Sequence, residues 1–303
     1  MMSEMIQRAT EAAHFEDLGR ESALIRLQRA MTWVYRRKAF ALGFGLLLLF
    51  VLCAVSAPWL APHSPTKTDY SVTLQAPSVD HLFGTDEHGR DLFSRVLFGT
   101  RISFVIAGVA VGLAIAIGVP LGLTAGYFGG YYDMVVGRIL DCVFAFPAVL
   151  LAMCICVLLG PSETTAMIAI GIVAIPECAR ISRAAVITVK EQTYIEASRA
   201  AGASALHILR RGILPNCLDP ILVLISLQFG YAVLNEAALS FLGIGAQPPS
   251  PSWGLLLARG RRFLFEAPWY SVFPGLAILL LVCTANLIGD GLRDLADPRT
   301  RRQ

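Results

Sequence analysis

Long apolar stretches alternate with polar segments along most of this sequence of 303 residues. Six stretches have the length or apolar content of membrane-spanning helices, since about 20 apolar residues cross the hydrocarbon core of a bilayer. They cover residues 39–57, 102–125, 139–159, 166–178, 218–241 and 271–288. The fourth is the shortest, because Pro176 interrupts it. The pattern predicts an all-α, polytopic membrane protein with six transmembrane helices.

Closely spaced glycines mark the second stretch. They are Gly108, Gly112, Gly118 and Gly122. Small residues let helix backbones approach each other in lipid, where no hydrophobic drive brings helices together. We therefore expect all four to lie at helix contacts.

Composition supports the membrane interpretation. Hydrophobic residues make up 55% of the chain and charged residues only 16%, whereas soluble domains carry about a quarter charged residues. The net charge of +3 is too small to indicate a nucleic-acid partner. Seven cysteines form no C-x-x-C pair, so neither a disulfide framework nor a cysteine metal site is indicated.

The distribution of Lys and Arg predicts the orientation. With the N-terminus inside, 18 of the 25 basic residues lie in inside segments and seven in outside segments. Cytoplasmic segments carry the basic excess in membrane proteins. We therefore expect both termini in the cytoplasm. Before the first span, apolar residues between positions 23 and 35 recur at helical spacing. This pattern predicts that residues 1–38 form an amphipathic segment on the inner leaflet. The first twenty residues also fit a mobile basic tail.

The outside segment at 58–101 ends in "HLFGTDEHGRDLFSRVLFGTR". Its apolar positions from Leu92 to Leu97 share one helical face, which predicts a helix lying flat at the outer interface, with Asp86 capping the turn before it. The segment also contains His63, His81 and His88. Their spacing matches no familiar ligand pattern, so we predict no metal site.

Motifs for catalysis or nucleotide binding are missing. The sequence contains no Gly-Lys pair, and hence no phosphate-binding loop. An ionisable residue within a predicted span is a functional candidate, because it is costly in lipid. Asn235 and Glu236 stand in the fifth stretch. We consider two interpretations. Either these residues line a solute pathway, or Glu236 pairs with a local partner near the outer end of its helix.

A basic, helical stretch, "YIEASRAAGASALHILRRGILPN", separates the fourth and fifth spans. We expect one short helix from Glu196 to Leu206, a bend at Gly202, and an end of the helical chain at Pro215. Its alanines have small side chains, so another protein could close around this helix. Arg199 is one of the basic residues at its edge. A rigid cytoplasmic projection on a protein without a nucleotide site indicates docking of a separate energy-supplying protein.

This stretch resembles the "EAA" loop of ABC-importer permeases, in which E-A-A is followed by a glycine and a later I-x-L-P. Glu196, Ala197, Gly202, Leu214 and Pro215 match the motif in register. Ser198 replaces the third motif position, and the expected isoleucine falls at Gly212, with Ile213 one place later.

Three other stretches resemble the second ("C") permease subunit of the dipeptide, oligopeptide and nickel branch: "FGTDEHGRDLFSRVLFGTRIS", "SFLGIGAQPPSPSWG" and "NLIGDGLRDLADP". The resemblance implies the type I importer permease fold. It divides the chain into a cytoplasmic N-terminal segment (1–38), a first helix with its periplasmic loop (39–100), the permease core (101–290) and a cytoplasmic tail (291–303).

The resemblance also implies partners. They are a homologous second permease, two ABC ATPases that hold the ATP and Mg, a periplasmic binding protein and the lipid of a bacterial inner membrane; this chain itself binds no cofactor and is not an enzyme. The loop from Glu196 to Pro215 would be the helix that couples it to an ATPase. The candidates for facing the binding protein are Asp86, Gly89, Arg90, Asp91, Pro248 and Trp253.

Alternatives remain for the solute and the class. Short peptides are the expected substrates, and nickel, glutathione and opine-type conjugates are the alternatives within the same mechanism. An ATP-independent secondary transporter with Glu236 as an ion site is the alternative from another class, although no inverted repeat is visible. An intramembrane enzyme would need paired catalytic residues, which the sequence does not show.

Overall fold

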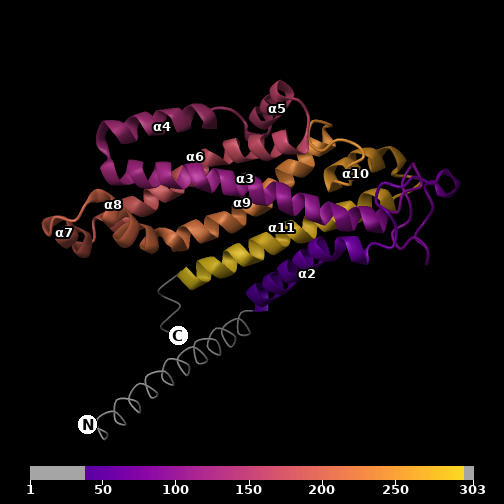
Figure 1. Cartoon of the computed structure of the whole chain (residues 1–303), viewed down its shortest axis with the longest axis horizontal. Coiled ribbons are helices and arrows are strands. Elements are labelled where there is room, and N and C mark those ends of the chain that lie inside the picture. The colour runs from indigo at the N-terminus through magenta and orange to yellow at the C-terminus, as the bar shows by residue number, and fades with distance from the viewer. Residues whose placement is uncertain (1–37, 297–303) are drawn as a thin grey trace, which may run out of the picture.

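The computed structural model describes residues 38–296, and the long helices lie side by side along one axis (Figure 1). They are α2 (Lys38–Leu60), α3 (Leu92–Phe128), α6 (Glu163–Lys190), α9 (Leu218–Phe241) and α11 (Trp269–Ala296). All five are long and apolar enough to cross a membrane. The amphipathic segment predicted before Lys38 and the tail beyond residue 296 lie outside the described residues.

The third predicted span is not one helix. The chain forms α4 (Gly130–Phe144) and α5 (Ala148–Leu159), whose axes differ by 84°. Pro147 stands directly before α5 in an extended conformation, and proline both lacks an N–H and keeps the preceding residue out of the helical region. The six-span prediction therefore holds only when this bent pair is counted as one crossing.

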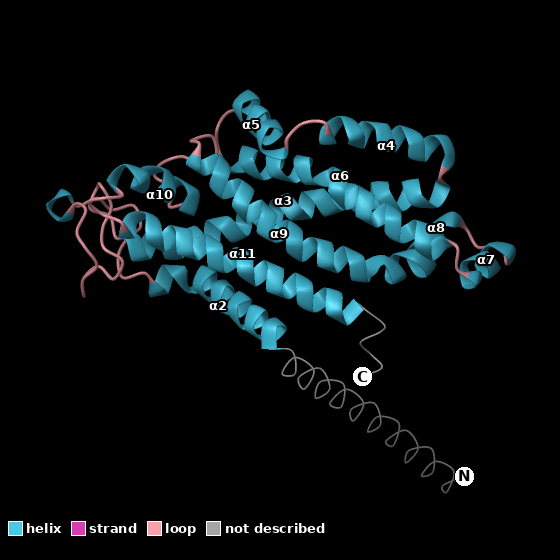
Figure 2. Cartoon of the chain, turned by 180° about the vertical axis from the view of Figure 1, so that it is seen from behind, coloured by secondary structure: helices cyan, strands magenta, loops and turns pink. Residues whose placement is uncertain are grey.

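The bent pair nevertheless carries the chain back along the bundle. In Figure 1, α4 starts where α3 ends, and α6 starts again near the end at which α3 began. As a result, the first described residues of α2 and the last of α11 lie toward the same end of the bundle (Figure 2). This arrangement agrees with the prediction that both termini lie on one side.

Two other predicted boundaries are wrong. The fourth span does not stop at Cys178, because α6 continues through the buried Pro176 to Lys190. The helix predicted to lie flat at the outer interface is instead the start of α3, unbroken from Leu92. Its polar residue Arg95 is as deeply buried as Leu92, because loops cover that end of the bundle.

Shorter elements fill the two ends. They are α7 (Thr193–Ala200), α8 (Ala205–His207), a π-helical turn at Ile208–Ile213, α10 (Trp253–Gly260), and 3₁₀ turns at Tyr70–Val72, Leu214–Cys217 and Arg261–Phe263. Among the described residues, extended segments pair only at an isolated bridge between Thr85 and Asp91. The all-α prediction is confirmed.

Helices α3 and α6 pack closely because of glycines. A Cβ added at Gly118, Gly122 or Gly126 would lie 2.7, 2.2 or 2.9 Å from a carbonyl oxygen of α6. The same addition at Gly108 or Gly112 meets nothing within 4 Å. The prediction that the glycines lie at helix contacts is therefore right for Gly118 and Gly122 and wrong for the other two.

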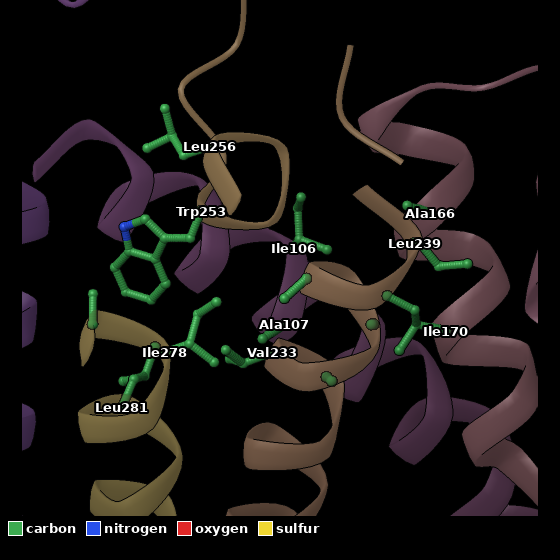
Figure 3. Close-up of a cluster of buried hydrophobic side chains, with 14 of the residues drawn as sticks. Ile106, Ala107, Ala166, Ile170, Val233, Leu239, Trp253, Leu256, Ile278 and Leu281 are labelled. Carbon is green, nitrogen blue, oxygen red and sulfur yellow. The ribbon is translucent and has the colours of Figure 1, made fainter. Parts of the chain in front are cut away.

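The largest hydrophobic core lies at the α10 end of the bundle. Figure 3 shows Trp253 and Leu256 of α10 beside Leu281 of α11, with Ile106 of α3 and Val233 of α9 nearby. All five side chains are buried. Because the buried residues of this core come from six helices, α3, α5, α6, α9, α10 and α11, α10 and its flanking loops are held firmly on the ends of the long helices.

Candidate functional site

The stretch between α6 and α9 forms a projection at the end of the bundle opposite α10 (Figure 1). We call residues 193–217 the knob. It contains α7 and α8 rather than the single predicted helix, and its π and 3₁₀ turns lead through Pro215 into α9 without an extended break. Proline is tolerated there because it occupies the first turn of a helical segment, where its missing N–H has no partner to lose.

Gly202 ends α7 in a left-handed conformation, with φ at +79°. The N–H of Gly202 donates to the carbonyl of Arg199 at 2.9 Å, and the N–H of Ala203 donates to the carbonyl of Ser198 at 3.1 Å. These two bonds form a Schellman motif, in which glycine avoids the steric cost of a Cβ. The bend predicted at Gly202 is thus a defined turn between α7 and α8.

Isoleucines anchor the knob to the bundle. Ile195, Ile208 and Ile213 are buried in one cluster with residues of α3, α6 and α9. A Cβ at Gly212 would lie 2.8 Å from the Cδ1 atom of Ile195, which explains why a small residue occupies the motif position and the isoleucine follows it. Arg199 is exposed, and its guanidinium lies over the ring of Tyr127 at 5.1 Å.

The matched motif residues divide between surface and interior. Glu196, Ala197, Gly202 and Pro215 are exposed, Ser198 and Leu214 are partly exposed, and Ile213 is buried. The exposed residues make the knob a surface that another protein can contact, whereas Ile213 fixes its position on the bundle.

Loops cover the other end of the bundle. We call residues 61–91 together with 243–268 the loop lobe. Asp86 is fully buried there, accepting bonds from the N–H groups of His88 and Arg90 and from the Arg90 guanidinium at 2.7 Å. Arg95 donates to the carbonyl of Pro65 at 2.7 Å. The predicted capping of the turn by Asp86 agrees with this geometry, and the charges hold the loops together.

Asp91 caps α3 and also lies close to two histidines. Its carboxylate accepts bonds from the N–H and hydroxyl of Ser94, and its other oxygen lies 2.9 Å from Nδ1 of His81 and 3.9 Å from Nδ1 of His63. The tertiary structure thus brings together His63, His81 and Asp91, with ligand atoms within 4.8 Å of one another. Asp86, Glu87 and His88 form a second such group. These are the places among the described residues where a metal could bind.

Glu87 joins the two parts of the loop lobe. It accepts a bond from Arg259 at 2.8 Å and another from the Tyr270 hydroxyl. Burial alone raises the pKa of the Glu87 carboxyl, but the bonds from Tyr270, its own N–H and Arg259 lower that pKa below the ordinary value. The carboxylate is therefore charged at neutral pH and tethers the loop before α3 to α10 and α11.

Most residues predicted to face a binding protein are inside the lobe. Asp86, Arg90, Asp91 and Trp253 are buried, and the indole N–H of Trp253 donates to the carbonyl of Val96 at 2.9 Å. Gly89 is also buried, with a Cβ there 1.7 Å from the carbonyl oxygen of Asp69. The prediction that these side chains face outward is wrong, because the long loops fold over them. Pro248 is exposed.

Glu236 lies in a pocket of hydroxyl groups rather than on a pathway. It is fully buried and accepts bonds from Ser240 and Ser252, each at 2.8 Å, and from Ser103 at 3.5 Å. Ser252 begins α10, so the carboxyl joins α9 to the loop lobe. This geometry favours the local-pairing alternative for Glu236. Asn235 points elsewhere, into a groove.

That groove was not predicted. It has a volume of about 490 Å³ and lies between α3, α6 and α9, with the α4–α5 bend at its edge. Its polar residues are Glu177, Gln228, Tyr231 and Asn235. The amide of Gln228 donates to the Glu177 carboxylate at 2.6 Å. The sequence feature that could have indicated this groove is Glu177, the single acidic residue in the fourth apolar stretch, which follows Pro176.

Residues 118–302 match the family described as the inner membrane component of binding-protein-dependent transport systems. The chain belongs to this family. Residues 26–77 also match the N-terminal transmembrane domain of oligopeptide transport permease C. The predicted resemblance to the C permease subunit is thereby confirmed, and the chain is a permease subunit of an ABC importer.

Relatives with named functions align with nearly the whole of this sequence. The dipeptide transport system permease protein of Alkalihalophilus pseudofirmus is 44% identical over 90% of this chain and 90% of its own length. The glutathione transport system permease protein of Shigella flexneri is 44% identical over 88% of this chain and 89% of its own length.

The fold is that of a known transporter. The inward-facing MetNI methionine ABC transporter contains a chain that aligns with 67% of this chain and 96% of its own length, at a TM-score of 0.57 and 20% identity. The predicted type I importer permease fold is confirmed.

Proposed function

We propose that this chain is the C-type permease of an ATP-driven importer that moves di- or oligopeptides across a bacterial inner membrane. The observation that carries the coupling mechanism is the knob: an exposed pair of short helices fixed to three long helices by Ile195, Ile208 and Ile213. A rigid projection of this kind passes a movement of a bound protein directly to the spans.

The proposed assembly contains a homologous second permease, two ABC ATPases and a periplasmic binding protein. The knob docks on an ATPase, which supplies ATP and Mg, and both termini lie in the cytoplasm. The loop lobe, at the opposite end, faces the binding protein through exposed residues such as Pro248 and Val79. ATP binding turns the cavity outward and hydrolysis returns it inward.

Peptides are the proposed substrate class because relatives named for dipeptides and for glutathione, itself a small peptide, match at equal identity. Nickel or an opine-type conjugate in the same mechanism is the second candidate. The groove argues against nickel, since the residues that line it include no His or Cys. An ATP-independent transporter with Glu236 as its ion site is disfavoured, because Glu236 is fully buried and hydrogen-bonded to Ser240 and Ser252.

Expression of the chain with its neighbouring genes tests the proposal. We expect the purified membrane complex to contain a second permease and ATPases, and proteoliposomes to take up a radiolabelled dipeptide only with ATP and the binding protein. Recovery of this chain alone, with uptake that needs no ATP, would refute the proposed mechanism. ATP-driven uptake of nickel without uptake of dipeptide would refute the substrate class.

A further inference from the structure

The groove holds a carboxylate that has no cationic partner among residues 38–294. Glu177 stands near the middle of α6 and is exposed on its surface. Its hydrogen-bond partner is the neutral amide of Gln228. The nearest arginine along the helix, Arg180, is held by Asp141 at 2.6 Å and by the ring of Phe144 at 4.1 Å. The negative charge of Glu177 is therefore available to a ligand.

Glu177 is an exposed residue in a helix that is apolar enough to span the membrane. A charged side chain within the hydrocarbon core is costly and turns toward a protein interior or a water-filled cavity. Gln228 is buried beside it, and Tyr231 and Asn235 follow on the same face of α9 at helical spacing. Within otherwise apolar helices, these polar groups form a strip along the groove.

The opposite edge of the groove is aromatic. Phe144 and Phe146 come from the bend between α4 and α5, which the 84° change of direction places beside α6 and α9. The groove thus offers one carboxylate, amide groups and aromatic rings within about 490 Å³. Small-ligand sites have this size and this mixture of apolar walls with a few polar groups.

We propose that this groove is a binding site for the solute in transit, and that Glu177 binds a primary ammonium group, such as the amino terminus of a short peptide. The inference rests on the proposed function. A peptide carries an ammonium group for Glu177, amide groups for Gln228 and Asn235, and a side chain for the phenylalanines. Charge-assisted hydrogen bonds are the stronger ones, so the ammonium contact fixes the orientation of the peptide.

Substitutions in the complete transporter, reconstituted with its ATPases and binding protein, test this site. Glu177→Gln keeps an acceptor for Gln228 but removes the charge. We expect it to lower ATP-driven uptake of a radiolabelled dipeptide at least tenfold, while ATPase activity stimulated by the loaded binding protein stays within twofold. Glu177→Asp, which retains the charge, should restore at least a third of the uptake. Glu163→Gln, at the far end of α6, is the matched control and should match wild type.

A second pair of variants leaves Glu177 in place. Ala174 lines the groove one helical turn before Glu177, so Ala174→Lys should neutralise the carboxylate and lower uptake, whereas Ala174→Gln should not. Uptake above half of wild type in Glu177→Gln, or equal uptake by Ala174→Lys and Ala174→Gln, overturns the inference. Absence of peptide uptake by the wild-type transporter is a different result, since it overturns the proposed function itself.

Discussion

Two buried carboxyl groups, those of Glu236 and Asp86, have hydrogen-bond partners that offset the cost of burying them. Glu236 is surrounded by three serine hydroxyls, and Asp86 by backbone N–H groups and an arginine. Buried polar groups without such bonds are strongly destabilising. The residues whose polarity stands out in the sequence are therefore mostly structural, and Glu177 differs because its charge is left unpaired.

The role of Glu236 can be tested by replacing its carboxyl group with an amide of the same shape. In Glu236→Gln the amide oxygen still accepts a bond from Ser240 or Ser252, so we expect peptide uptake within twofold of wild type. Glu236→Leu leaves the serines without their acceptor and should lower the thermal midpoint of the purified protein clearly. Loss of uptake in a stably folded Glu236→Gln protein would instead restore Glu236 as a pathway residue.

Gly202 provides a test of the knob. A Cβ at this position meets nothing within 4 Å, so Gly202→Ala adds only the backbone cost of a left-handed residue, about 1–2 kcal/mol. We expect the α7–α8 turn to loosen and ATPase stimulation by the loaded binding protein to fall severalfold, with normal membrane insertion.

The matched control is Gly243→Ala, where φ is +81° and a Cβ again meets nothing within 4 Å. That glycine lies in the loop lobe, at the other end from the knob, so the same strain there should leave co-purification of the ATPases intact, whereas Gly202→Ala should reduce it. Equal losses of co-purifying ATPase in the two variants would show that strain in general, rather than the knob, is responsible.

At the scale of elements, the contact between α3 and α6 depends on three glycines one turn apart. Gly118, Gly122 and Gly126 bring backbone against backbone, which is how helices associate tightly in lipid. The sequence indicated this contact but not its extent, because spacing alone does not tell which glycines face α6. Gly108 and Gly112 share the spacing and lie on the open face.

Substitution of one glycine on each face tests this contact. Gly122→Val places methyl groups against the Ala179 carbonyl, where a Cβ would already be at 2.2 Å. We expect a loss of about 1–3 kcal/mol in stability, as overpacking costs, and a lower thermal midpoint in detergent. Gly112→Val should change the midpoint little. Similar midpoints for both variants would contradict the close α3–α6 packing.

For the whole molecule, the knob and the loop lobe lie at opposite ends of the bundle (Figure 1). The proposed orientation, with both termini in the cytoplasm, requires the knob to be cytoplasmic and the loop lobe periplasmic. This follows from the antiparallel course of α2, α3, the α4–α5 pair, α6, α9 and α11 along one axis.

Single cysteines check this orientation after the native cysteines are replaced. Val79 in the loop lobe is 95% exposed, and Ala200 at the end of α7 is exposed. We expect a membrane-impermeant maleimide to label Val79→Cys with the inner membrane intact, and Ala200→Cys only after that membrane is opened. The reverse labelling pattern would place the knob outside and rule out its contact with an ATPase.

The sequence by itself determined the all-α membrane class, the approximate spans and the knob motif. These depend on hydrophobic runs and on local spacing, which neighbouring residues set. Only the tertiary structure decided the bend between α4 and α5, the burial of Asp86 and Trp253, the grouping of His63 with His81, and the groove at Glu177. These depend on which faces of distant segments meet. In a membrane protein the sequence gives little indication of which helix faces meet, because faces that contact lipid and faces that contact other helices are equally apolar.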